Sequence, residues 1–132
     1  MRLLLDTHIA LWLTYDSRKL SPAVRELVES SENTCFASAA SVWEIAVKHA
    51  IRRRSGALAI EVSGSEALSN FQSVGLAILP ITGAHAAMVD SLPRHHRDPF
   101  DRLLVAQALA EPLRLVTADK ALAIYGEIVI LV

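Results

Sequence analysis

Acidic side chains stand at several places in this sequence where metal-dependent chemistry could be built. Asp6 directly follows the apolar run RLLL, and Asp119 comes just after RLVT. Glu44 lies inside SVWEIAVK, and Asp98 and Asp101 lie in HRDPFDRLLVAQA. If four or five ionised carboxylates converge on one pocket, they repel one another unless cations are present. Oxygen ligands without a cysteine cluster or paired histidines favour Mg²⁺ or Mn²⁺ over zinc.

Asp6 and Asp119 each follow an apolar run that reads as a buried strand. In open parallel sheets, ligand sites gather beyond the carboxyl ends of the strands, so both acids stand where a site is expected. Each acid can equally serve as the N-cap of the helix that follows it. Their joint occurrence in one small domain favours a shared crevice.

We expect Asp98 and Asp101 to have different roles. Asp98 before Pro99 is a strong helix start, because aspartate caps and proline is tolerated in the first turn. Asp101 then falls at the third helical position, where the positive helix end keeps a carboxylate ionised. We expect Asp98 mainly to start the helix, with at most an indirect contact to a metal, and Asp101 to point inward as a metal ligand.

Glu44 has two interpretations. It can pair with Lys48 one turn further along an exposed helix face, an interaction of only ~0.3–0.5 kcal/mol. However, most of the surrounding helix is apolar, which predicts that Glu44 lies near buried surface. A half-buried carboxylate without a partner would neutralise, whereas a metal would keep it ionised. This favours the functional interpretation.

Basic and hydroxyl side chains near these acids are candidate substrate contacts. Thr7 and Thr117 each stand beside an acid and could orient bound water, although strand-end packing explains them equally well. The remaining candidates for holding a phosphate backbone are Lys48, Arg52, Arg53, His96 and Arg97. Such basic runs can also be solvated faces without a ligand.

The elements that must position these residues alternate along the chain. Five apolar runs are typical of buried strands: RLLL, NTCFAS, LAILPI, LRLVT and IVILV. Helical patterns separate them, among them a helix with Ser21 as N-cap and Pro22 at its first position. This order predicts a single α/β domain over residues 1–132, a three-layer sandwich with a mainly parallel central sheet flanked by helices.

Composition narrows the class of protein further. The chain has 132 residues, a formal net charge of −1 and one cysteine, so an internal disulfide is excluded. No apolar stretch approaches the roughly 20 residues that a membrane helix needs, and no targeting segment is visible. We therefore expect a cytoplasmic protein with no membrane contact.

Taken together, the motifs resemble those of PIN-domain ribonucleases, in particular the toxin subunits of VapBC-type toxin–antitoxin pairs. The segments that carry the resemblance are LLLDTHIALWL, ASAASVWEIAVK, HRDPFDRLLVAQAL and LRLVTAD, in this order. The resemblance implies a PIN-like fold and Mg²⁺- or Mn²⁺-dependent hydrolysis of RNA. Metal ligands would be Asp6, Glu44, Asp101 and Asp119. It further implies a homodimer and a cognate antitoxin protein.

Two other functions stay open on the sequence. A catalytically silent PIN-like interaction module is one, although such a module has no need to keep a repulsive cluster of acids. A metal-dependent nuclease acting on DNA, or a phosphatase on the same scaffold, is the other, because phosphate contacts to DNA and RNA are similar.

Overall fold

A computed structural model describes residues 1–55, 61–93 and 97–132, with the backbone alone for residues 52–55. Within these residues, five strands form one sheet in the order β3-β2-β1-β4-β5, and all neighbouring pairs are parallel. The strands are β1 (Arg2–Leu5), β2 (Thr34–Ser38), β3 (Ala77–Leu79), β4 (Arg114–Thr117) and β5 (Val129–Leu131). The expected α/β class and parallel sheet are confirmed.

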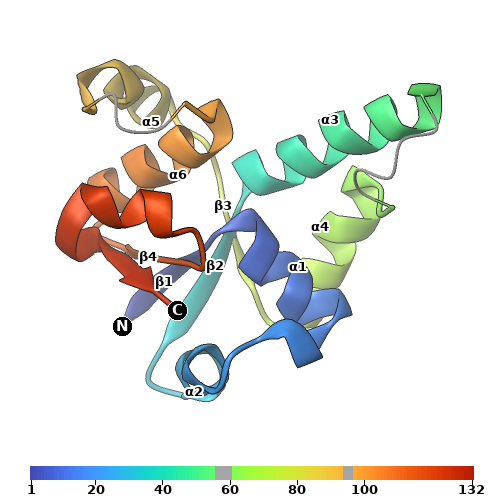
Figure 1. The fold of residues 1–132 in the computed structure, drawn as a ribbon, viewed down its shortest axis with the longest axis horizontal. Coiled ribbons are helices and arrows are strands. Elements are labelled where there is room, and N and C mark those ends of the chain that lie inside the picture. Colours follow the sequence, from blue (N-terminus) through green and yellow to red (C-terminus); the bar gives the residue numbers. More distant parts are fainter. Residues whose placement is uncertain (56–60, 94–96) are drawn as a thin grey trace.

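Helices connect successive strands (Figure 1). They are α1 (Thr7–Tyr15), α2 (Pro22–Glu29), α3 (Ala39–Ser55), α4 (Gly64–Ser73), α5 (Gly83–Met88) and α6 (Pro99–Ala110), with 3-10 segments at Ser17–Lys19, Val89–Ser91 and Lys120–Ile128. The expected cap of α2 is present, since Ser21 Oγ accepts from the Val24 N–H at 3.3 Å. None of the helices in the described parts of the chain is long and apolar enough to span a membrane.

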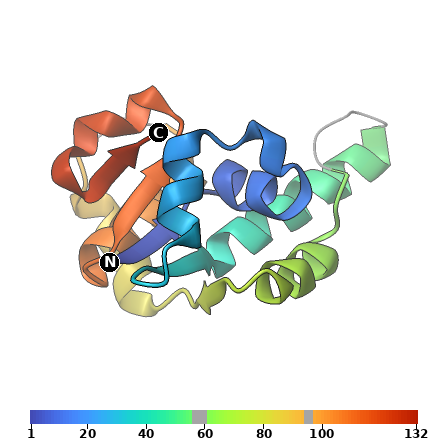
Figure 2. The same ribbon diagram turned by 90° about the horizontal axis from the view of Figure 1, so that it is seen from below.

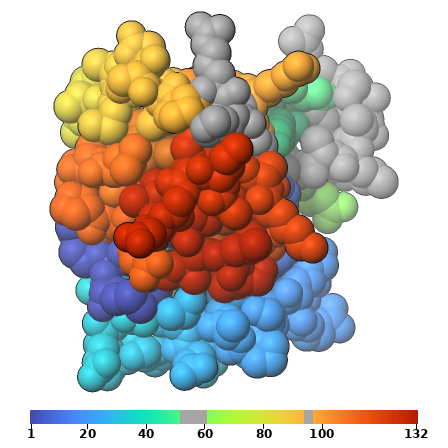
Figure 3. Space-filling view, turned by 60° about the vertical axis from the view of Figure 1, so that its left-hand side comes forward, coloured from blue at the N-terminus to red at the C-terminus, as the bar shows by residue number. Residues whose placement is uncertain are grey.

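The sheet is buried on both faces, which gives three layers (Figures 1 and 2). Successive side chains of a strand point to opposite faces, so Leu3 and Leu5 enter one core and Leu4 enters the other. The first core also contains residues of α1, α2, α3 and α4, among them Ile9, Val24, Ile45 and Phe71. The second contains residues of α6 and of the C-terminal 3-10 segment, among them Leu104 and Leu122. Figure 3 shows this C-terminal part, in orange and red, over much of one side of the molecule.

The strand order places a crevice beside β1. The chain moves outward from β1 through β2 to β3 on one side, and later through β4 to β5 on the other. Leu5 is in register with Ala37 of β2 and with Val116 of β4. The next residues, Asp6, Ser38 and Thr117, therefore lie together at the carboxyl edge of the sheet, where open parallel sheets bind ligands.

Two expected helices differ in detail from the sequence prediction. The helix expected over TGAHAAMVDSL ends as α5 at Met88 and continues as a 3-10 turn. The short helix expected after Asp119 is a 3-10 segment, broken by Gly126 at φ 88° before β5 begins. Glycine adopts this left-handed backbone without the clash that a Cβ would cause.

Candidate active site

A pocket of about 240 Å³ opens at the carboxyl edge of the sheet. It is lined by Asp6, His8, Glu44, Lys48, Asp98, Asp101 and Asp119. These include every acid that the sequence singled out, and they come from the end of β1, the middle of α3, the start of α6 and the turn after β4. The structure thus brings together five carboxylates from four places that are far apart in the chain.

Asp6 lies deep in the pocket, with only 5% of its surface exposed. Its Oδ1 accepts from the Ile9 N–H at 2.8 Å, which caps α1, and its Oδ2 accepts from the Thr117 hydroxyl. Burial raises the pKa of Asp6 above its ordinary value, although the hydrogen bond from Thr117 opposes this effect. The negative charge of Asp119 acts in the same direction as burial.

Glu44 is also buried, with 3% of its surface exposed, and both of its oxygens have partners. Thr7 Oγ1 lies 2.7 Å from Glu44 Oε1 and 2.8 Å from Ser41 Oγ, so the carboxylate accepts from the threonine. Lys48 Nζ lies 2.5 Å from Glu44 Oε2. The ion pair considered as an alternative is therefore present. It is not on an exposed face, however, because its carboxylate lies inside the pocket.

Asp98 and Asp101 lie as expected at the start of α6. Asp98 Oδ1 accepts from the Phe100 N–H at 2.9 Å and from the Asp101 N–H at 3.4 Å, so Asp98 is the N-cap. Both carboxylates are half-buried and line the pocket. Asp101 thus reaches the pocket from the first turn of α6. Asp98 fixes the start of that helix as its N-cap.

Asp119 stands at the exposed rim of the pocket. Its Oδ1 accepts from the Ala121 N–H at 2.9 Å, and its own N–H donates to Thr117 Oγ1 at 3.0 Å. Asp6 and Asp119 therefore both cap the segments that follow them and both line the pocket. The interpretation of these acids as helix caps and their interpretation as residues of a shared crevice therefore do not exclude each other.

The donor set decides whether the pocket suits a divalent cation. The acids offer oxygen ligands, which Mg²⁺ and Mn²⁺ prefer. No three His, Cys, Asp or Glu side chains of the described residues are gathered closely enough to hold an ion as they stand. A nearby cation would nevertheless stabilise the ionised form of the buried Asp6. The donor atoms of the site therefore fit a hard cation.

The candidate substrate contacts are distributed unevenly. Lys48 lines the pocket, and Arg97 is exposed without lining it. The hydroxyls of Thr7 and Thr117 both donate to carboxylates of the site, and their contact with substrate stays a prediction. His96 and the side chains of Arg52 and Arg53 lie outside what the structure describes.

The sequence interpretation missed three features of the site. His8 lines the pocket, although only its position two residues after Asp6 signalled this. Ser41 Oγ lies within hydrogen-bond distance of Thr7 Oγ1, the hydroxyl that donates to Glu44. The rings of Trp43 and Phe100 meet edge to face, with centroids 4.9 Å apart, and link α3 to α6 beside the acids that these helices carry. No periodicity in the sequence indicates such contacts between elements.

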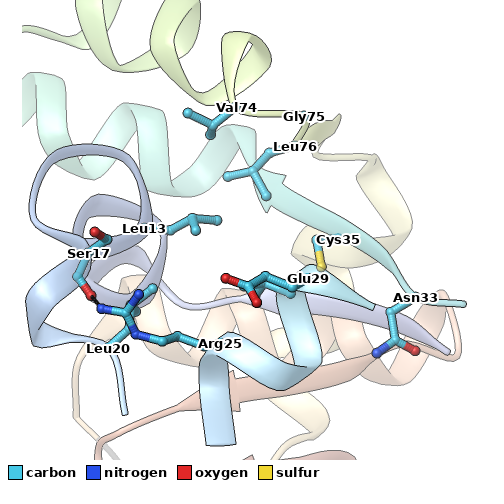
Figure 4. Close-up of a pocket in the computed structure, with 11 residues that line it drawn as sticks. Leu13, Ser17, Leu20, Arg25, Glu29, Asn33, Cys35, Val74, Gly75 and Leu76 are labelled. Atoms are coloured by element: carbon cyan, nitrogen blue, oxygen red, sulfur yellow. Dashed lines mark hydrogen bonds between the residues drawn. The ribbon is translucent and has the colours of Figure 1, made fainter. Parts of the chain in front are cut away.

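A second cavity, of about 270 Å³, lies away from the acids between α1, α2 and the turn before β3 (Figure 4). Leu13, Leu20 and Leu76 give it an apolar lining, and Cys35 lies on its wall. Burial raises the pKa of the Cys35 thiol, so the thiol stays protonated and poorly nucleophilic at neutral pH. One carboxylate, Glu29, lines this cavity, against the five that line the acidic pocket.

Comparison with known proteins agrees with the fold. The family model described as PIN domain matches residues 3–128. The chain belongs to the PIN domain family. Ribonuclease VapC22 of Mycobacterium tuberculosis (strain ATCC 25618 / H37Rv) is 32% identical over 120 residues, which cover 90% of this chain and 88% of that protein.

A solved structure supports the fold independently. It is the crystal structure of VapBC2 from Rickettsia felis bound to a DNA fragment from their promoter. The matching chain has a TM-score of 0.67 at 20% identity, with 100% of this chain and 98% of that chain covered. At this identity the likeness shows the shared PIN-like architecture.

Proposed function

We propose that this chain is an endoribonuclease that depends on Mg²⁺ or Mn²⁺, and that it is the toxin component of a toxin–antitoxin pair. The observation that carries the proposal is the convergence of five carboxylates, from four separate places in the chain, on one pocket of a PIN-family sheet. The similarity to a mycobacterial ribonuclease supports RNA as the substrate.

The reaction is hydrolysis of a phosphodiester bond. A divalent ion in the pocket would activate water and stabilise the negative charge that develops on the phosphate. Asp6, Glu44, Asp101 and Asp119 would hold it. Thr117 and Thr7 keep the two buried carboxylates oriented through their hydroxyls. Asp98 contributes indirectly, because its cap fixes the turn from which Asp101 extends.

Binding of the RNA backbone falls to basic side chains around the pocket. Lys48 already lies among the acids, and Arg97, which directly precedes the N-cap of α6, is exposed. We assign the same role to Arg52, Arg53 and His96. Contacts of this kind give affinity and strong salt dependence but little sequence choice.

Protein partners are the second part of the proposal. We assign contacts with a second copy and with an antitoxin to the apolar residues that α3 leaves exposed: Trp43, Val47 and Ile51, which are 56%, 36% and 52% exposed. They follow one another at four-residue spacing and so share one face of the helix. The apolar residues Leu11, Trp12 and Leu13 of α1, in contrast, are partly buried against the core.

Calorimetric titration of Mn²⁺ into antitoxin-free protein, paired with an RNA cleavage assay, tests the proposal. We expect wild type to bind the ion and to cut RNA, and Asp101→Asn to lose both. Asp90→Asn is the matched control, because Asp90 is exposed and does not line the pocket. If the wild-type protein neither binds Mn²⁺ nor cleaves RNA, the result would support the interaction module instead. Cleavage of DNA in preference to RNA would establish the DNA nuclease instead.

A further inference from the structure

Gln107 is a buried polar residue of α6 that the proposed chemistry does not use. None of its surface is exposed, and its amide makes contacts on both sides. Its Oε1 accepts from the Ser38 hydroxyl at 2.5 Å, and its Nε2 donates to the Pro80 carbonyl at 3.2 Å. The amide thereby ties α6 to the carboxyl ends of both β2 and β3.

Ser38 extends this connection to the acidic pocket. It follows Ala37, which is in register with Leu5, so Ser38 lies beside Asp6 on the neighbouring strand. Its Oγ also accepts from the Ala40 N–H at 2.9 Å, in the first turn of α3 and one helical turn before Glu44. A single hydroxyl thus joins the start of the helix that carries Glu44 to the helix that carries Asp101.

His85 fixes the orientation of the amide from the other side. The Thr82 N–H donates to His85 Nδ1 at 3.1 Å, so this nitrogen is unprotonated. The proton is then on Nε2, which donates to Glu111 Oε1 at 2.7 Å. Gln107 Nε2 lies 3.4 Å from the unprotonated Nδ1, a position that suits an amide nitrogen and not an amide oxygen.

We propose that Gln107 and Ser38 are a positioning pair that sets the placement of Glu44 and Asp101 on the two sides of the pocket. The inference rests on the proposed function, because it concerns the metal site of that function. Neither residue touches the substrate. They act by holding α3, α6 and the ends of β2 and β3 in one arrangement, as supporting hydrogen bonds do around metal ligands.

A double-mutant cycle tests the pair in the intact chain. Gln107→Met keeps the length of the side chain and removes its hydrogen bonds, and Ser38→Ala removes one hydroxyl. Gln72→Met is the matched control, because Gln72 is exposed on α4 and does not line the pocket. The readouts are the dissociation constant for Mn²⁺ by calorimetry, well below the melting temperature, and thermal unfolding in chelator.

We expect each single variant to bind Mn²⁺ about 10-fold more weakly than wild type, as is typical when a supporting contact of a metal ligand is lost. The double variant should bind Mn²⁺ no more weakly than whichever single variant has the lower Mn²⁺ affinity. Both changes break the same connection, so their effects should not add. The control should bind as wild type does.

Variants that are less stable but bind Mn²⁺ with wild-type affinity would overturn the positioning role and leave the proposed function intact. If Gln107→Met does not fold, the Mn²⁺ affinity of Ser38→Ala alone tests the positioning role. Wild-type affinity of that variant would overturn the role. Wild type that does not bind Mn²⁺ would instead overturn the proposed function, and the positioning role with it.

Discussion

Single residues in this site serve the fold and the pocket at once. The carboxylate of Asp6 caps α1 with one oxygen and accepts from Thr117 with the other, while lying almost fully buried. A capping residue on the surface would keep its charge at little cost. Here the same cap is placed where burial disfavours the charge, which is the condition under which a cation binds most favourably.

The raised pKa of Asp6 predicts a particular dependence of stability on pH. The folded state binds a proton at Asp6 more tightly than the unfolded state does. The contribution of Asp6 to the free energy of unfolding is therefore highest below the ordinary pKa of 3.8 and falls as pH rises through the raised value. We expect the stability of Asp6→Asn relative to wild type to be greater at pH 7 than at pH 4, measured by urea unfolding in chelator. An equal difference at both pH values would contradict this.

The variants Asp98→Asn and Asp101→Asn should differ in their RNA cleavage activity. Asparagine caps a helix about as well as aspartate does, so Asp98→Asn should keep its stability within about 0.5 kcal/mol and retain most activity. Asp101→Asn should lower cleavage at least ~100-fold, since loss of an outer contact alone typically costs 10–100-fold. Rates of RNA cleavage and urea midpoints of both variants check this. Equal losses of activity would show that Asp98 is itself a ligand.

At the scale of elements, α3 is held close to α4 by a glycine. A Cβ added at Gly64 would lie 2.9 Å from the Cβ of Ala46, which is closer than such atoms approach. Packing at this position therefore depends on the absence of a side chain. Because α3 carries Glu44, the contact also bears on the site.

Gly64→Ala should force the two helices apart and destabilise the protein by about 1–3 kcal/mol, the usual cost of overpacking. Gly83→Ala is the matched control, because Gly83 begins α5 with open space around the position of a Cβ. Urea unfolding of both variants measures the difference. Wild-type stability of Gly64→Ala would show that the helices yield without cost.

The elements could be predicted from the sequence because their signals are local. Apolar runs mark the buried strands, and Ser21 with Pro22 marks the start of α2 in both sequence and structure. The acids were found for a similar reason, since Asp6 directly follows β1 and Asp119 comes two residues after the end of β4. Gln107, Ser38 and His85 could not be found in this way. Their contacts join three elements that only the tertiary fold brings together.

At the scale of the whole molecule, a formal net charge of −1 has to be reconciled with the polyanionic substrate that we propose. Five of the carboxylates counted in this charge line the pocket, so the proposed binding of RNA relies on basic side chains placed beside it. Figures 1 and 2 show α3 extending away from the sheet, and its last residues include the arginines assigned to this role.

Replacing Arg52 and Arg53 together by alanine should weaken RNA binding and flatten its salt dependence. Each lost phosphate contact lowers the slope of log K against log salt by about 0.7 for single strands, so two should lower it by about 1.4. Fluorescence anisotropy of a labelled single-stranded RNA, with Asp101→Asn as the parent to prevent cleavage, measures the slope. Arg25→Ala is the control, since Arg25 lies at the second cavity and not at the acidic pocket. An unchanged slope would place the arginines against a protein partner.

The central place of β1 also bears on how the pocket forms during synthesis. Asp6 is made before Thr117, which donates to it and follows 111 positions later. Strand β4 can pair with β1 and complete the wall of the pocket only after β4 itself has left the ribosome. A nascent or prematurely ended chain therefore carries the first acid without the last, and the pocket assembles late, in a slow step that closes a long loop. Translation itself thus delays the appearance of the proposed nuclease site until β4 has been made.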